Sequence, residues 1–343
     1  MDATLVPIVL GDGPRRRLTV APAEIKELTF AQLGVQEADL EEFIRRNIDI
    51  VFPDETLLVV GQQVVNEGRG RADLVALDAA GAVVLIEIKR DAEDMRSRAE
   101  QLEWQAIRYA ANYALIDGPS ALAQSLFAPY IEKHREEFGK PELTPVQLAD
   151  ELLADFMVRP DEFNRRQRIV LIASSYSDEV LSACAWLSRG GIDIRCLTLS
   201  PVEHKGQNFL VIEQTIPPTK LEEFFVAVAE RGSRRPATAK SASTAQRRGN
   251  LPRMRALIDW GIVKPGDKLY IKNHPDATAV VVDAETVTFA GEQLRFNDWG
   301  TKVTGWSAIN IYEWAMLASA DRTLDELRRH HMEELARAAK EAG

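Results

Sequence analysis

Residues 70–91 carry the pattern of a tight β-hairpin, and this pattern limits the possible fold more than any other feature of the chain. Two apolar runs, RADLVALD and AVVLIEIK, are separated by the three residues 79–81. Gly81 ends this short loop at the position where a bulged hairpin turn needs a positive φ. The segment therefore predicts two adjacent antiparallel strands with a fixed register.

The register of this hairpin brings charged residues from both strands to one face. If Asp78 pairs with Ala82, Asp73 lies opposite Glu87. Side chains alternate between the two faces of a strand, so Lys89 shares the face of Glu87. The hairpin thus predicts two carboxylates and an ammonium side by side.

The second strand of the hairpin is otherwise apolar on both faces. A charged hairpin usually turns its charges to solvent, but a strand that is apolar on both faces is typically covered on both sides, where an unpaired charge is costly. The apolar residues are Val83, Val84, Leu85, Ile86 and Ile88. Carboxylates at the end of such a strand suit a hard divalent cation, and a nearby lysine can stabilise charge on a phosphate or orient a water molecule. The pattern favours metal-assisted hydrolysis of a phosphodiester.

Asp73 and the sequence Glu87-Ile88-Lys89 resemble the aspartate and the E-x-K of the PD-(D/E)XK nuclease superfamily. The resemblance implies that Asp73 and Glu87 bind Mg²⁺, or Mn²⁺, together with the carbonyl oxygen of Ile88. It implies that Lys89 steadies the attacking water or the developing negative charge. It also implies an α/β fold in which a restriction-endonuclease-like mixed sheet is flanked by helices.

The segment VQEADLEEFIRRNIDIVF, upstream of the hairpin, predicts a helix with one apolar stripe. Glu37 falls inside this stripe, Glu41 lies at its edge and Glu42 points away. The stripe consists of Leu40, Phe43, Ile44 and Ile48. In similar nucleases a glutamate of the first helix supports the metal site, so Glu37 is expected to reach the metal. The alternative is that Glu37 is a first-turn acid favoured by the helix dipole.

A long helix is predicted downstream of the hairpin, in AEDMRSRAEQLEWQAIRYAANYALI. Gln105 and Tyr109 are four residues apart in it and therefore share one face. This pair is similar to the Q-x-x-x-Y element of the RecB-like branch of the superfamily, where it lies beside the active site and positions DNA or the lysine. Core packing is the alternative explanation of the pair.

Residues 118–165 are predicted to be mostly helical, and their pattern indicates no particular chemistry. Next, RIVLIAS, SDEVLSACAWLSRGG and IDIRCLTLS predict a strand, a helix and a strand, and a right-handed crossover would make the two strands parallel. FLVIEQT adds a further strand. We expect these strands to extend the nuclease sheet, so that one nuclease domain spans residues 1–230.

Residues 231–250 are basic, contain no acidic residue and lack apolar periodicity, so they predict a flexible linker. Their positive charge would bind phosphates nonspecifically or would merely keep the linker soluble. The whole chain has a formal net charge of −10, which argues against a purely electrostatic DNA binder but not against a nuclease.

The length of 343 residues is sufficient for two domains or more. Cys184 and Cys196 are the only cysteines, and both lie in apolar patterns. They suggest a reducing, cytoplasmic location without a disulfide framework. The sequence contains no recognisable signal peptide, membrane span or cysteine-histidine zinc pattern.

Residues 251–343 predict a small α+β domain that ends in a charged helix. The order LIDWGIVKPGDKLY, two hairpin-like segments and VTGWSAINIYEWAML resembles the RAMA domain, named for its association with restriction enzymes and adenine methylases. The resemblance implies a reader of modified DNA. Such a reader needs aromatic rings, because stacking contributes roughly 1 to 3 kcal/mol per base. The candidates are Trp299, Trp306, Asn310 and Tyr312, and the alternative role of the rings is to form the core of a small domain.

Together these patterns predict a Mg²⁺-dependent DNA endonuclease that its C-terminal domain directs to modified DNA, in restriction or defence against phage. Two alternatives stay open. One is a repair nuclease that acts on mismatched or branched DNA, and the other is a catalytically idle protein that binds modified DNA. The expected partner is DNA and not a membrane, and cleavage of both strands would require a homodimer or repeated nicking.

Overall fold

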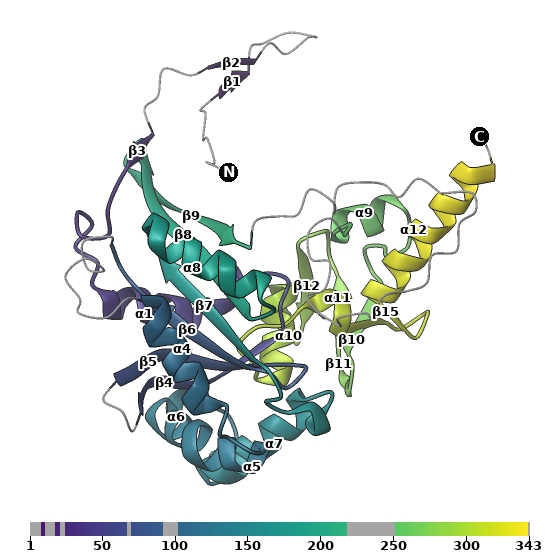
Figure 1. Cartoon of the computed structure of the whole chain (residues 1–343). Helices are drawn as coiled ribbons and strands as arrows, with labels where there is room; N and C mark the ends of the chain where they lie inside the picture. Colours follow the sequence, from purple (N-terminus) through teal and green to yellow (C-terminus); the bar gives the residue numbers. More distant parts are fainter. Residues whose placement is uncertain are drawn as a thin grey trace, which may run out of the picture.

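The computed structural model describes residues 8–10, 18–20, 25–66, 70–91, 102–217 and 251–341. Within these ranges the chain forms two large β-sheets (Figure 1). A seven-stranded sheet is built from residues 26–216, and a six-stranded sheet is built from residues 268–323. Near the N-terminus, β1 (Ile8–Leu10) and β2 (Leu18–Val20) form a separate antiparallel pair.

The larger sheet is mixed, with the order β3-β8-β7-β6-β5-β4, and β9 also pairs with β8. Its strands are β3 (Lys26–Glu27), β4 (Leu57–Asn66), β5 (Gly70–Asp78), β6 (Val83–Ile88), β7 (Gln167–Ala173), β8 (Asp193–His204) and β9 (Gln207–Ile216). The central strands β6 and β7 are almost completely buried, which explains why their sequences are continuous apolar runs.

The hairpin of β5 and β6 has the register predicted from its loop. Leu74 pairs with Ile86, and the backbone N–H of Asp78 donates to the carbonyl of Ala82 at 3.0 Å. Gly81 has a φ of 92°, the positive value that the turn requires. The loop geometry therefore places Asp73 opposite Glu87.

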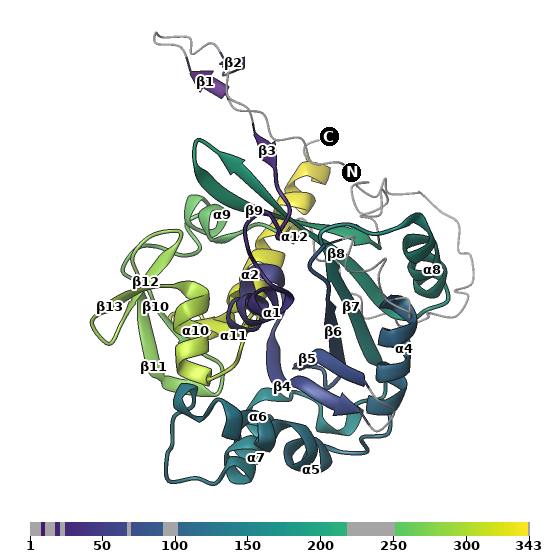
Figure 2. The same ribbon diagram turned by 90° about the vertical axis from the view of Figure 1, so that its left-hand side faces the viewer.

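The strands β6, β7 and β8 run parallel to one another, as predicted for the strand-helix-strand segment. Two helices, α4 (Leu102–Tyr113) and α8 (Asp178–Arg189), lie in the connections between these strands and cover one face of the sheet. Two others, α1 (Glu37–Arg46) and α2 (Ile48–Val51), lie on the opposite face (Figure 2). The predicted fold class, a mixed sheet flanked by helices with a small C-terminal α+β unit, is confirmed.

The segment 118–165 is mostly helical, as predicted, and it packs against the edge strand β4. Its elements are α5 (Pro119–Leu122), η1 (Ala123–Phe127), α6 (Ala128–Lys133), η2 (Arg135–Glu137), α7 (Pro145–Phe156) and η3 (Pro160–Glu162). Both η1 and α6 contact β4, and Figure 2 shows α6 below that strand. The segment therefore supports one edge of the sheet.

Residues 251–341, called the C-terminal module below, form the smaller sheet and its helices. The strands are β10 (Lys268–Ile271), β11 (His274–Val281), β12 (Thr286–Phe289), β13 (Glu292–Arg295), β14 (Ala315–Leu317) and β15 (Arg322–Thr323). The helices are α9 (Met254–Asp259), α10 (Phe296–Thr304), α11 (Ile311–Trp314) and α12 (Leu324–Glu341). All neighbouring strands of this sheet are antiparallel.

The C-terminal module is joined to the larger sheet at the beginning of β4. Leu57 and Ala308 form an antiparallel β-bridge. Beside it, the ring of Trp306 contacts Phe156 of α7 edge to face, with a centroid distance of 5.1 Å. Trp314 Nε1 donates to Thr56 Oγ1 at 3.1 Å. Apolar packing and backbone hydrogen bonds therefore hold the two sheets together.

Candidate active site

The ammonium of Lys89 lies at the centre of the predicted site and is surrounded by oxygen atoms. Lys89 is 1% exposed, and its Nζ lies 3.3 Å from Asp73 Oδ2, 3.5 Å from Glu37 Oε1 and 3.7 Å from Glu87 Oε2. Nζ also donates to the carbonyl oxygen of Ile88 at 2.6 Å. The structure thus brings together five residues that sequence motifs had selected from three separate segments.

The backbone of β6 fixes the position of these groups. The N–H of Ile88 donates to Asp73 Oδ2 at 2.8 Å, and the N–H of Lys89 donates to the carbonyl of Ile172 in β7 at 2.8 Å. Asp73 is therefore bound to the strand that carries Glu87. Because these contacts belong to the central sheet, the carboxylates are held without help from a mobile loop.

The first turn of α1 delivers Glu37 to the site. The N–H of Gln36 donates to Asp39 Oδ2 at 2.8 Å, a capping contact that fixes where the helix begins. Leu40 and Ile44 are buried as predicted, but Phe43 is 38% exposed, so its place in the apolar stripe was wrong. The helix is rotated so that Glu41 and Arg45 face inward instead.

Glu41 is a second helix-borne carboxylate near the site, and it is only 4% exposed. The side-chain amide of Gln63 donates to Glu41 Oε2 and also to Asp73 Oδ1, the latter at 3.1 Å. Burial raises the pKa of Glu41, although hydrogen bonds from Gln63 and Gln62 act in the opposite direction. Two of the three glutamates of α1 therefore reach the site, Glu37 at Lys89 and Glu41 through Gln63.

Gln105 and Tyr109 of α4 lie beside Glu87. The amide of Gln105 donates to Glu87 Oε2 and to Tyr109 Oη, each at 3.3 Å. Tyr109 is 2% exposed. The pair therefore does more than fill the core, because Gln105 binds a carboxylate of the site directly.

The oxygen atoms around Lys89 have the chemistry that a hard divalent cation prefers. Within the described residues, no three His, Cys, Asp or Glu side chains are arranged as ligands of one metal ion. The carboxylates converge on the ammonium instead. Three carboxylates and the carbonyl oxygen of Ile88 surround one ammonium, and this set of oxygen donors fits Mg²⁺ or Mn²⁺.

The four base-reading candidates of the C-terminal module are buried and do not line a common surface pocket. Trp299 is 0% exposed, Trp306 is 3%, Asn310 is 7% and Tyr312 is 8%. The backbone N–H of Asn310 donates to Thr56 Oγ1 at 3.0 Å, so this residue contacts the larger sheet. A base would reach these side chains only if the module opened.

Tyr312 is also held in place from both sides. Its hydroxyl accepts a hydrogen bond from the N–H of Met254 at 2.8 Å, and the guanidinium of Arg328 lies 4.3 Å from its ring centroid. These contacts tie α11 to α9 and α12. Their arrangement is that of a packed core, the alternative role given for the aromatic residues.

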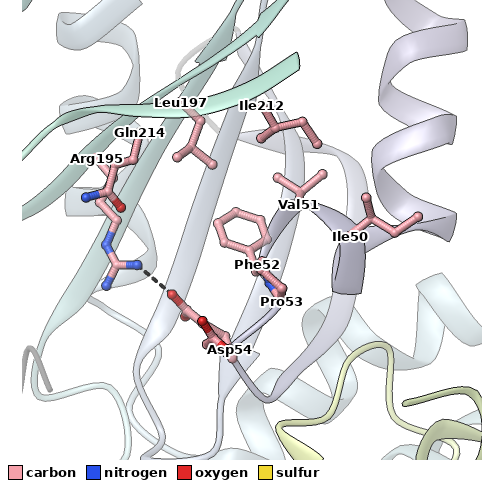
Figure 3. Close-up of a pocket in the computed structure, with 10 residues that line it drawn as sticks. Ile50, Val51, Phe52, Pro53, Asp54, Arg195, Leu197, Ile212 and Gln214 are labelled. Atoms are coloured by element: carbon pink, nitrogen blue, oxygen red, sulfur yellow. Dashed lines mark hydrogen bonds and ion pairs between the residues drawn. The ribbon is translucent and has the colours of Figure 1, made fainter. Parts of the chain in front are cut away.

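Sequence patterns did not indicate a cavity of about 270 Å³ between residues 50–55 and the strands β8 and β9. Phe52, Leu197 and Ile212 are among its lining residues (Figure 3). At its rim Arg195 Nη1 donates to Glu55 Oε1 at 2.5 Å. The buried Arg168 forms an ion pair with the other oxygen of Glu55 at 2.8 Å. Glu55 and the two arginines therefore neutralise one another's charge.

No family model matches the chain, and no curated protein matches it. Among solved structures, the EndoMS–dsDNA2 complex matches over 56% of this chain and 59% of that chain, with 19% sequence identity and a TM-score of 0.23. This TM-score is too low to assign a common fold. Among the helices of the described ranges, none is long and apolar enough to cross a membrane.

Proposed function

We propose that the protein is a metal-dependent DNA endonuclease. The observation that supports this proposal is the convergence of Glu37, Asp73 and Glu87 on the buried ammonium of Lys89. Burying Asp73, Glu87 and Lys89 together is expensive, and charge clusters of this kind are typical of catalytic sites. The order of these residues along the chain is that of the PD-(D/E)XK motif.

The carboxylates of Asp73, Glu87 and Glu37 and the carbonyl of Ile88 would hold the cation. When bound, Mg²⁺ would polarise the scissile phosphate. Lys89, released from part of its carboxylate contacts, would hold the attacking water or the developing charge on the phosphate. Because Lys89 is buried, its stem allows little movement, which keeps the ammonium within reach of the reacting atoms.

Gln105 and Tyr109 would position the DNA strand or Lys89. Gln105 binds Glu87 directly, and the hydroxyl of Tyr109 follows in the same chain of hydrogen bonds. A substrate phosphate or water that replaces one of these contacts would be oriented by the other residue. The catalytically idle alternative has less support, because the whole acidic set and its lysine are present and in contact.

We further propose that the chain consists of a nuclease domain in residues 1–230, a linker in residues 231–250, and a domain in residues 251–343 that directs it to modified DNA. The support for this direction is the sequence resemblance to the RAMA domain. The contact between Leu57 and Ala308 would hold such a domain against the nuclease sheet. The residues 231–250 lie outside the described ranges.

The test is cleavage of phage DNA with modified bases, unmodified plasmid, and mismatched or branched duplexes, each with Mg²⁺, Mn²⁺ or EDTA. Lys89→Ala is the inactive variant, and Lys205→Ala, in the exposed turn between β8 and β9, is the matched control. We expect metal-dependent cleavage of modified DNA by the wild type and by the Lys205 variant. Preferred cleavage of mismatched or branched DNA would favour a repair nuclease. Equal cleavage by Lys89→Ala would refute the site.

A further inference from the structure

Gln63 has an unusual backbone conformation in the middle of the edge strand β4. Its φ is 52°, in the left-handed region that residues other than glycine rarely adopt. The neighbours on both sides pair normally with β5, Gln62 with Leu74 and Val64 with Ala72. Gln63 therefore lies opposite Asp73, while its own backbone departs from the extended conformation of the rest of β4.

The side chain of Gln63 shows what this conformation provides. Its single amide nitrogen donates to Asp73 Oδ1 at 3.1 Å and to Glu41 Oε2. A neutral donor between two carboxylates reduces their repulsion without neutralising either of them. Backbone strain of this kind persists when surrounding contacts fix it, and it is concentrated at functional sites.

Gln63 also completes the fixation of Asp73. The other oxygen of this carboxylate, Oδ2, accepts from the N–H of Ile88 at 2.8 Å and lies 3.3 Å from Lys89 Nζ. Only Gln63 binds Oδ1 among the contacts described for Asp73 in the structured part of the chain. Without Gln63 the carboxylate would be held from one side only, and Glu41 would lose its link to the site.

We propose that Gln63 is a positioning residue that holds Asp73 in the orientation needed to bind the divalent cation and links Glu41 to it. This inference rests on the proposed nuclease function. It assigns the left-handed backbone of β4 a role at the site and connects Glu41, which no motif selected, to the residues that carry out the chemistry. Residues that orient metal ligands typically change metal affinity or activity about 10- to 100-fold when they are replaced.

Two substitutions separate this role from a purely structural one. Gln63→Gly removes the side chain and suits the left-handed backbone, so the fold should keep or gain thermal stability. Gln63→Asn tolerates the same φ but is one methylene shorter, so it should not span both carboxylates. Lys205→Gly is the matched control, because Lys205 has a φ of 51° in the turn between β8 and β9.

The readouts are the melting temperature, the Mn²⁺ dissociation constant from calorimetry without DNA, and the kcat and KM of cleavage. We expect both Gln63 variants to bind Mn²⁺ about ten-fold more weakly and to lose about ten-fold in kcat, with KM for DNA little changed. Lys205→Gly should match the wild type in Mn²⁺ affinity and in kcat. Wild-type Mn²⁺ affinity and kcat in the Gln63 variants would overturn the inference alone. A wild-type protein that neither binds Mn²⁺ nor cleaves DNA would overturn it together with the proposed function.

Discussion

Leu57 and Ala308 exchange both backbone hydrogen bonds of an antiparallel bridge, at 3.0 and 2.9 Å. Leu57 is the first residue of β4, the strand that also carries Gln63. The C-terminal module is therefore attached to an element of the candidate site and not to a remote surface. Changes at this junction and changes at the site involve the same strand.

Replacing Trp306 by alanine should destabilise the molecule by about 3 to 5 kcal/mol, the usual loss for a large aromatic residue in a core. Trp306 packs on Phe156 and lies 4.6 Å, centroid to centroid, from Trp314. The control is Trp186→Ala, because Trp186 is 76% exposed and should change stability by less than about 0.5 kcal/mol. Urea unfolding followed by circular dichroism measures both. Equal midpoints for the two variants would contradict the described junction.

Replacing Lys89 by methionine should lower the free energy of unfolding in EDTA by roughly 3 kcal/mol, because the substitution leaves the buried carboxylates without the Lys89 ammonium. Adding Mn²⁺ should raise the melting temperature of this variant more than that of the wild type, since the ion would supply the missing positive charge. Thermal unfolding with and without Mn²⁺ is the measurement. A variant as stable as the wild type in EDTA would show that the ammonium does not hold the cluster together.

Glu42 should contribute stability that depends on pH. A hydrogen bond from the Arg45 guanidinium lowers the pKa of Glu42 to about 2, while burial acts in the opposite direction. The unfolded chain therefore binds the proton more readily, so the contribution is present above about pH 4.5 and is lost as pH falls toward 2. Melting temperatures of Glu42→Gln and wild type should differ at pH 7 and converge near pH 2 to 3. A constant difference over this range would exclude this ion pair as its source.

Gly81→Ala should be more destabilising than Gly206→Ala. Both glycines have positive φ values, 92° and 77°, so each substitution introduces backbone strain of about 1 to 2 kcal/mol. At Gly81 an added Cβ would also lie 3.1 Å from the Cα of Phe163, whereas at Gly206 it would meet open space. The additional loss should be about 1 kcal/mol. Guanidinium unfolding of the two variants gives the difference directly, and a larger loss for Gly206→Ala would contradict the described hairpin packing.

The hairpin and the parallel strands could be predicted from sequence because their signals are local. A loop of three residues with a terminal glycine sets the register, and apolar runs on both strand faces indicate burial. The position of Asp73 opposite Glu87 follows from these signals alone. The same holds for Gln105 and Tyr109, whose spacing places them on one helix face.

Other parts of the site depend on contacts between distant segments, which periodicity does not contain. Glu41 and Arg45 face inward because Gln63, Tyr130 and Glu137 provide their hydrogen bonds. The apolar periodicity predicts Phe43 inside, because hydrophobicity is the only guide to the inward face when the hydrogen-bond partners of the neighbouring polar residues are unknown. The left-handed conformation of Gln63 has no signature in its residue type.

Lys89, at the centre of the carboxylate cluster, allows the site to form during folding before any metal ion binds to it. Like-charged side chains brought together during folding would repel one another, but here the polypeptide supplies a cation of its own, 3.3 to 3.7 Å from three carboxylates. The chain can therefore fold before any ion arrives. In the proposed nuclease, metal supply would then determine when the molecule is active, while folding would set its abundance independently.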